Sequence, residues 1–285
     1  MRIRATVAAV TGALALSALA VPAAQAADVP WSSGRTAFGA ATADGTVGTA
    51  AELDVTFSNM KVNSGKNIVV GTTNAVKVPV TYTLTHPADL DTGADNFANG
   101  PLIYKGSSAE TATNMLISDE PATCTAASST KLSCKGVITI RPADGDLSSD
   151  EAGTWNAGGL ALAGEEDVKV QGGLGAVRVQ RYSKLTVNAT PEPVKKGKTI
   201  TVTGKLSRAN WDDNKYHGYT NQPVKLQFRK KDSSTYTTVK TIKSNSTGEL
   251  KTTVKASVDG YFRYSFAGTN TTPAVNATGD FVDVK

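Results

Sequence analysis

Two histidines, His86 and His217, are the side chains of this sequence whose ordinary pKa suits proton transfer near neutral pH. The strand pattern described below places each at a turn, in different halves of the chain. Neither lies in a zinc-binding histidine motif or near a nucleophile motif. Two carboxylates alone can hydrolyse a glycoside, but such enzymes have clefts lined with aromatic rings, and aromatic residues make up 6% of this chain. We therefore expect that the protein is not an enzyme.

An acidic stretch in the first half is a candidate calcium site, with Asp144, Asp146 and Asp150 as ligands. Together with Ser148 they place oxygens at relative positions 1, 3, 5 and 7, as the first part of a calcium-binding loop does. The stretch lacks the glycine and the bidentate glutamate of an EF-hand, because Ser149 and Trp155 stand at those positions. Ca²⁺ is the one cofactor that the sequence suggests, and a solvated turn without a metal is the alternative.

Three aromatic residues lie close together in one loop of the second half: Trp211, Tyr216 and Tyr219. Aromatic rings interleaved with polar residues can stack on sugars, so these three are candidate ligand-binding residues. The alternative is that Trp211 and Tyr216 cover the end of a β-sandwich core.

Positive charge is concentrated in the second half. Residues 184–285 contain 17 Lys and Arg against 8 Asp and Glu, a balance of +9, whereas residues 27–183 contain 11 against 17, a balance of −6. In the predicted strand from Val224 to Phe228 the apolar residues alternate with polar ones, which leaves Lys225 in water. The predicted basic surface is made of Lys225, Arg229, Lys230 and Lys231.

An anionic cell-wall polymer is the partner that this basic surface favours, with an extracellular protein or a glycan as alternatives. A surface that only keeps the protein soluble is a further alternative. Nucleic acid is not an expected partner, because an exported protein rarely meets it.

The first residues have the three parts of a secretory signal peptide. Arg2 and Arg4 are positive, an apolar run from Ala5 to Val21 follows, and Ala24-Gln25-Ala26 supplies a cleavage site. We expect residues 1–26 to be removed and the protein to be secreted, extracellular or associated with the cell wall. No membrane span is expected in the rest of the chain.

The two cysteines, Cys124 and Cys134, are close in sequence and have no histidine nearby. In an oxidising compartment such a pair is typical of a disulfide, and the spacing matches no metal or redox motif. We therefore predict a Cys124–Cys134 disulfide.

The remaining sequence alternates polar and apolar residues and is interrupted by turn residues every 8–12 positions, which indicates an all-β protein. Pro79 stands on the polar side of the clearest alternation, so an edge strand or a bulge is expected there. The first-half strands are predicted over Leu53–Phe57, Val76–Leu84, Gly136–Ile140 and Gly175–Val179.

The second half contains seven predicted strands in about 100 residues, the size and strand number of an immunoglobulin-like sandwich. A tyrosine just after the turn at Asp259-Gly260 is expected to hydrogen-bond back to the backbone. The strands are predicted over Leu185–Val187, Thr199–Gly204, Val224–Phe228, Tyr236–Ile242, Leu250–Val254, Tyr261–Phe266 and Phe281–Val284.

Four segments carry a resemblance to a known family: Thr190–Gly197, Thr201–Gly204, Val224–Arg229 and Asp259–Tyr264. Together they make the region from Leu185 to Lys285 resemble the bacterial Ig-like module of secreted actinobacterial proteins. The resemblance implies a fold and an extracellular location, and some members of that group carry a calcium-binding label. The first half resembles no family that we can name.

These observations predict two tandem β-sandwich domains after a cleaved signal peptide, the C-terminal one immunoglobulin-like. The expected domains are residues 1–26 (signal peptide), 27–182 (acidic) and 183–285 (basic). The expected function is that of a secreted, non-catalytic binding or structural protein, associated with the cell envelope or extracellular polymers through its basic domain. The alternatives are a calcium-dependent binding module and a carbohydrate-binding module.

Overall fold

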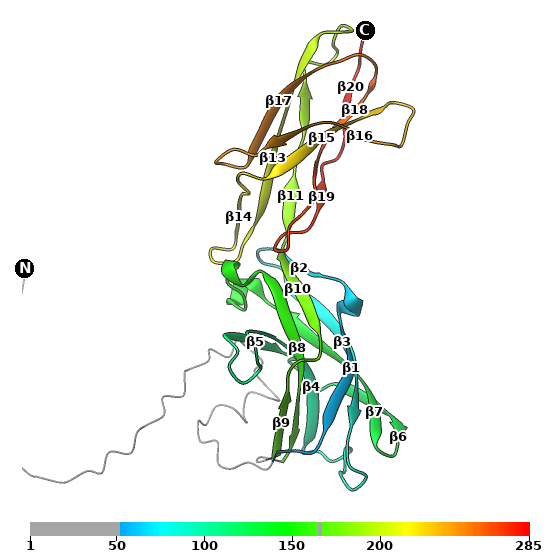
Figure 1. Cartoon of the computed structure of the whole chain (residues 1–285), viewed down its shortest axis with the longest axis vertical. Coiled ribbons are helices and arrows are strands. Elements are labelled where there is room, and N and C mark those ends of the chain that lie inside the picture. The colour runs from blue at the N-terminus through cyan, green and yellow to red at the C-terminus, as the bar shows by residue number, and fades with distance from the viewer. Residues whose placement is uncertain (1–51, 165–166) are drawn as a thin grey trace, which may run out of the picture.

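The computed structural model describes residues 52–164 and 167–285, and these form strands and three short 3-10 helices (Figure 1). The predicted signal peptide and its cleavage site lie outside the described residues. Two β-sandwiches follow each other along the long axis of the molecule, as Figure 1 shows. No helix among the described residues is long and apolar enough to cross a membrane.

The N-terminal sandwich contains a four-stranded antiparallel sheet in the order β1-β3-β7-β6. Its strands are β1 (Thr56–Val62), β3 (Val76–Thr85), β7 (Lys131–Ile140) and β6 (Thr123–Ser128).

The second sheet of this sandwich has the order β2-β10-β8-β4-β5, and β9 also pairs with β8. Its one parallel pair joins β2 and β10. The strands are β2 (Ile68–Val70), β10 (Ala176–Arg181), β8 (Gly153–Ala163), β4 (Phe97–Lys105), β5 (Asn114–Ile117) and β9 (Asp167–Gln171). Three 3-10 helices lie between strands: η1 (Asn63–Gly65), η2 (Pro142–Asp144) and η3 (Ser149–Glu151).

The core of the N-terminal sandwich forms where the two sheets face each other. Strand β3 contributes every second side chain to it, including Tyr82, while its Lys and Thr residues face water. From the opposite sheet β8 contributes Trp155, which is fully buried. Gly159 of β8 lies against the ring of Phe57, where a Cβ atom would come within 2.4 Å of that ring, so the close contact requires glycine.

Strand β8 is also covered on its outer face. Leu160 and Leu162 pack there in a second cluster with Tyr104 of β4 and Ala109 and Met115. Because side chains on both faces of β8 are buried, its sequence does not alternate, and the strand was not predicted.

The C-terminal sandwich is built from two further sheets. One is centred on β13, which pairs with β11, β12, β14 and β17. The other has the order β16-β15-β18-β19, with β20 also on β18. The strands are β11 (Ser183–Leu185), β12 (Asn188–Thr190), β13 (Thr199–Asn210), β14 (Lys215–Gly218), β15 (Pro223–Lys230), β16 (Thr237–Lys243), β17 (Glu249–Lys255), β18 (Gly260–Phe266), β19 (Val275–Asn276) and β20 (Asp280–Val282).

Tyr264 ties the two sheets of the C-terminal sandwich together. Its ring is fully buried in the core, and its hydroxyl donates a 2.9 Å hydrogen bond to the carbonyl of Val202 on β13. The expected bond from a tyrosine to the backbone is therefore made by Tyr264, and it crosses the sandwich. Burial raises the pKa of Tyr264, so this hydroxyl remains a donor at physiological pH.

The all-β, two-sandwich prediction is confirmed, with an immunoglobulin-like C-terminal unit. The predicted disulfide is confirmed as well and joins directly opposed residues of β6 and β7. The prediction that Pro79 marks an edge strand or a bulge is only half correct. Strand β3 lies inside its sheet, but its pairing with β1 ends at Val80, so the missing N–H of Pro79 has no β1 partner to lose.

Candidate functional site

The acidic stretch of the first half, the predicted calcium site, forms two short 3-10 turns. Asp146 is 1% exposed, and its carboxylate accepts a 2.6 Å hydrogen bond from the backbone N–H of Arg141. Asp150 accepts a 2.6 Å bond from the Ser148 hydroxyl, which lowers the pKa of Asp150. Asp144 lies in η2.

Within residues 52–164 and 167–285, no three His, Cys, Asp or Glu side chains are placed together so that they could hold a metal ion. Asp144, Asp146 and Asp150 are therefore not placed together as a three-carboxylate cluster in the described residues, and calcium binding there stays a prediction. The carboxylates of Asp146 and Asp150 each accept a hydrogen bond within these turns, from a backbone N–H and from a hydroxyl respectively.

Trp211 lies between the two sandwiches and not on a ligand-binding surface. Its side chain is 2% exposed and packs into the core cluster of the N-terminal sandwich, although the residue follows β13 of the C-terminal one. The indole N–H donates to the carbonyl of Gly71 at 2.9 Å. The prediction that Trp211 stacks on a ligand is wrong, because both its ring and its N–H are used within the protein.

Tyr216 and Tyr219 have cations over their rings. The ammonium of Lys184 is 3.5 Å from the ring centroid of Tyr216, and the guanidinium of Arg208 is 3.9 Å from that of Tyr219. The edge of Tyr216 also meets Tyr182. These contacts occupy a face of each ring, so the three aromatic residues do not form the predicted platform for sugars.

Polar contacts around Trp211 complete the joint between the sandwiches. The Ser149 hydroxyl donates to the side chain of Asn210 at 2.6 Å, and Arg181 donates to the carbonyl of Ala209 at 2.5 Å. Burial, with a smaller contribution from the nearby charge of Arg208, lowers the pKa of Arg181 to about 10. Only Tyr182 separates β10 from β11, so the joint is short as well as packed.

The two histidines lie in different sandwiches. His86 is buried, whereas a turn residue in water was expected, and its Nδ1 is 2.8 Å from the carbonyl of Pro87. His217 on β14 faces Asp213 across a turn at 2.6 Å, and this contact lowers the pKa of Asp213. The two imidazoles therefore do not share a site.

The predicted basic surface covers the outer face of the sheet that contains β15 and β18. Lys225 and Lys230 of β15 are exposed, as expected. Arg229 is only partly exposed, because its guanidinium lies 3.8 Å from the ring centroid of Tyr261 on β18. On the same face the guanidinium of Arg263 lies 3.8 Å from the ring centroid of Tyr236.

These contacts continue into a row of cations and aromatic rings. The Tyr261 and Phe281 ring centroids are 5.1 Å apart, and the ammonium of Lys231 is 5.7 Å from the Phe281 centroid. The guanidinium of Arg229 also lies 5.4 Å from the ring centroid of Tyr236, and this contact joins the Arg263–Tyr236 pair to the rest of the row. We call this row the cationic ladder; its members are Arg263, Tyr236, Arg229, Tyr261, Phe281 and Lys231.

The cationic ladder keeps its positive charge, because an aromatic ring attracts a cation without carrying a compensating negative charge. In the described part of the C-terminal sandwich, Lys285 forms an ion pair with Asp283, and the imidazole of His217 contacts the carboxylate of Asp213. The other lysines and arginines of this sandwich have no carboxylate within ion-pairing distance there.

The ring members of the ladder were missed at the sequence level. The alternation of β18 held the signal, since Phe262, Tyr264 and Phe266 share the buried face and so place Tyr261 and Arg263 on the outer one.

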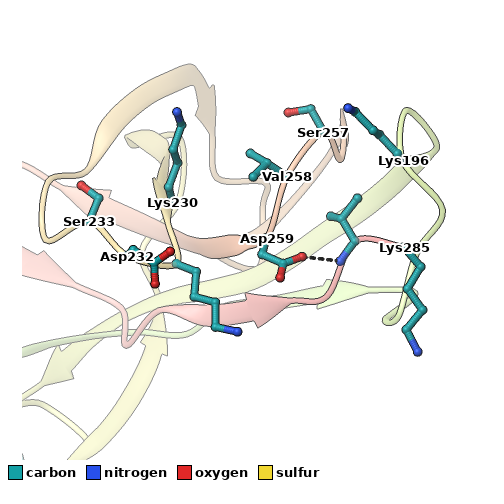
Figure 2. A pocket seen from close by; sticks show the side chains of 10 residues that line it. Lys196, Lys230, Asp232, Ser233, Ser257, Val258, Asp259 and Lys285 are labelled. Atoms are coloured by element: carbon teal, nitrogen blue, oxygen red, sulfur yellow. Dashed lines mark hydrogen bonds between the residues drawn. The ribbon is translucent and has the colours of Figure 1, made fainter.

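A hollow of about 620 Å³ opens at the end of the C-terminal sandwich farthest from the joint, and Figure 2 shows the side chains that line it. The turn after β15, the turn before β18, the turn before β13 and the last residues of the chain enclose it. The side chains that line it and carry polar groups are Lys196, Lys230, Lys231, Asp232, Ser233, Ser257, Asp259 and Lys285. Lys230 and Lys231 thus belong both to the predicted basic surface and to this hollow.

Comparison with known proteins gives only distant similarities. No family model matches the chain, and no curated protein sequence matches it. Among solved structures, the D00–D0 domain of intimin is similar at 16% identity, over 78% of this chain and 98% of that chain, with a TM-score of 0.26.

Two further structures illustrate the range. The adhesin InvE of Yersinia pseudotuberculosis has 13% identity, over 80% of this chain and 58% of that chain, with a TM-score of 0.26. The titin I-band fragment I67–I69 has 10% identity, over 81% and 65%, with a TM-score of 0.32. Such low scores transfer no property to this chain, and the description of its fold rests on its own sheets.

Proposed function

We propose that this is an exported, non-catalytic binding protein whose basic C-terminal domain attaches it to an anionic polymer of the cell envelope or its surroundings. The observation that carries the proposal is the cationic ladder, which holds positive charges on neutral rings at fixed positions. A polymer with many negative groups gains attraction from several such charges at once.

The side chains of the ladder are held in fixed positions, and this strengthens the attraction. A lysine or arginine that is free in water loses rotamer entropy when it is fixed by a ligand. Arg229 and Arg263 are already held over rings, and Arg263 also donates to Gln227 at 2.8 Å. Binding through these groups therefore has a smaller ordering cost than binding through mobile lysines.

An extracellular site of action agrees with the disulfide. Cys124 and Cys134 are bonded to each other, and such bonds persist mainly in oxidising compartments. The proposal takes residues 1–26 as a cleaved signal peptide, residues 27–182 as the acidic domain and residues 183–285 as the basic domain. A polymer that attracts the basic domain repels the acidic one, so the acidic domain would be presented away from the polymer.

Retention of the purified protein on isolated cell wall tests the proposal. Raising the salt from about 50 mM to about 500 mM shortens the screening length from about 14 Å to about 4 Å, so retention should be strong at low salt and largely lost at high salt. The matched control is a variant that removes charge from the ladder outside the hollow described below, Arg263→Gln, which should be retained less at the lower salt.

Two results would contradict the proposal. One is the absence of retention at the lower salt, and the other is retention that does not respond to salt. Equal retention of the wild type and of the control variant would show that the wall is bound through another surface.

A further inference from the structure

The hollow at the end of the C-terminal sandwich has an excess of ammonium groups (Figure 2). Lys196, Lys230, Lys231 and Lys285 line it, against the carboxylates of Asp232 and Asp259. Of the four ammonium groups, that of Lys285 lies 3.6 Å from Asp283, and the other three have no carboxylate within ion-pairing distance in the described residues.

One of the two acidic residues in the hollow already has a structural role. Asp259 accepts a 2.8 Å hydrogen bond from the backbone N–H of Val284, the dashed line in Figure 2, and so joins the turn before β18 to the end of the chain. Its charge is partly satisfied by that bond, so it opposes an incoming anion less than a fully solvated carboxylate would.

Arg229 holds one wall of the hollow in place without entering it. Beneath the turn that follows β15, its guanidinium donates to the carbonyl of Ser233 at 2.8 Å and to that of Lys231 at 3.4 Å. The same guanidinium lies over Tyr261, as described above. Arg229 is therefore a positioning residue, which fixes the turn that carries Lys230 and Lys231.

The donors around the hollow fit a phosphate group. Ammonium groups act as point charges with three donors each, and they suit tetrahedral oxyanions, whereas flat carboxylates are matched best by the fork of an arginine. The one arginine of this region, Arg229, has its fork engaged with backbone carbonyls. The Ser233 hydroxyl accepts a bond from the Thr235 N–H at 3.1 Å and keeps its own hydrogen to donate, and the Ser257 hydroxyl also lines the hollow.

We propose that this hollow binds a phosphate group of the anionic polymer, with Lys196, Lys230 and Lys231 as the charged donors and Ser233 and Ser257 as hydroxyl donors. The inference rests on the proposed function and names the chemical class of its ligand. A volume of about 620 Å³ lies within the usual range of ligand sites, about 300–1,000 Å³, so one sugar-phosphate unit would fit.

Two double variants of the full-length secreted protein separate this site from the general positive field. Lys230→Gln with Lys231→Gln removes two charges from the hollow, and Lys225→Gln with Lys243→Gln removes two exposed charges elsewhere on β15 and β16. Soluble polyphosphate is the phosphate probe, polygalacturonate is the carboxylate probe, and binding is measured by calorimetric titration. Unchanged near-ultraviolet circular dichroism establishes that each variant is folded.

The expected result is a loss of polyphosphate affinity of about tenfold or more for the hollow variant and of about twofold for the control, because charged hydrogen bonds outweigh screened long-range attraction. Polygalacturonate should bind more weakly, and about equally to the two variants. Equal loss of polyphosphate affinity in both variants would overturn the inference while leaving the proposed function intact. Failure of the wild type to bind either polyanion or cell wall would instead overturn the proposed function.

Titration of the wild type with inorganic phosphate provides a measurement that needs no substitution. Amide resonances of residues 230–233 and 257–259 should shift on adding phosphate, with smaller shifts elsewhere. Shifts spread evenly over the basic sandwich, or an equal response to sodium chloride at matched ionic strength, would contradict a phosphate site in the hollow.

Discussion

In the N-terminal sandwich Arg141 and Lys169 are each held by a carboxylate, whereas in the C-terminal sandwich Arg208, Arg229 and Arg263 lie over aromatic rings. All six cation–π contacts within residues 52–164 and 167–285 belong to the C-terminal sandwich. Both arrangements hold a long side chain in place, but only the ion pair cancels its charge.

This difference explains how one half of the chain can be both ordered and strongly positive. Ion pairs would also have fixed the arginines, but the paired carboxylates would have cancelled the positive potential that attracts a polyanion. Aromatic rings hold the arginines in place and leave that positive potential uncancelled. The joint around Trp211 adds a second contrast, because there the C-terminal sandwich contributes an aromatic side chain to the core of its neighbour.

The largest expected effect is that of Trp211→Ala. The indole is buried in the N-terminal core, so its removal should lower the free energy of unfolding of the N-terminal sandwich by about 3–5 kcal/mol. Thermal unfolding followed by calorimetry, with hydrogen exchange to assign the transition, measures this.

Trp211→Phe is the matched control, which keeps a ring and loses the bond to Gly71, and it should have a smaller effect. A transition of the N-terminal sandwich that does not move in Trp211→Ala would mean that each sandwich is stable without the other.

The second largest effect concerns the disulfide, which lies in the N-terminal sandwich. Replacing Cys124 and Cys134 together by Ala opens a loop of about ten residues, and the chain-entropy model gives a loss of about 2–3 kcal/mol. Chemical denaturation should show the loss in the N-terminal transition alone. An equal shift of both transitions would indicate that the joint couples the two sandwiches into one cooperative unit.

The origin of the successes and failures of sequence-based prediction is visible in particular elements. Strand β3 was predicted because one face is wet and the other buried, which gives strict alternation over Val76–Leu84. The strand predicted over Leu53–Phe57 begins only at Thr56, and β11 ends at Leu185 where a strand was predicted to begin. Strand ends depend on tertiary pairing more than on local pattern.

The candidate sites were predicted less well than the fold. Trp211 bonds to a carbonyl 140 residues earlier in the chain, and nothing local indicates which backbone oxygen will accept an indole. Likewise, the acidic stretch has the composition of a calcium loop, but an oxygen of Asp146 and one of Asp150 each accept a hydrogen bond within the turns. The exposure of Lys225 on β15 was predicted correctly, because the alternation of polar and apolar residues is enough to place it in water.

A third prediction tests the cation–π side of the comparison. Arg229→Met removes the charge and keeps much of the apolar packing, so the C-terminal sandwich should lose about 1–2 kcal/mol from the cation–π contact and the bonds to the turn. Because a cation–π contact contains no carboxylate that acid could protonate, the loss should be the same at about pH 7 and about pH 4. A loss that shrinks on acidification would mean that a carboxylate, and not the ring, holds this arginine.

The smallest expected effect is the loss of stability in acid that arises from the ion pair between Arg141 and Asp119. The hydrogen bond from Arg141 is the main cause that lowers the pKa of Asp119 below its usual value. A lowered pKa in the folded state stabilises the protein above the unfolded pKa of about 3.9, and this contribution is lost as the pH falls through the folded value. Arg141→Gln should therefore remove less than about 1 kcal/mol at neutral pH and flatten the acid limb of the N-terminal transition.

The C-terminal sandwich should respond to acid in the opposite direction at Glu192. Burial, followed by the charge of the neighbouring Asp280, raises the pKa of Glu192. A raised pKa adds stability below the unfolded value of about 4.3, and the contribution is lost as the pH rises through the folded value. Acidification towards about pH 3 should thus move the N-terminal transition down more than the C-terminal one, and Glu192→Gln should reduce that separation. Parallel movement of both transitions in the wild type would remove the distinction between carboxylate-held and ring-held cations.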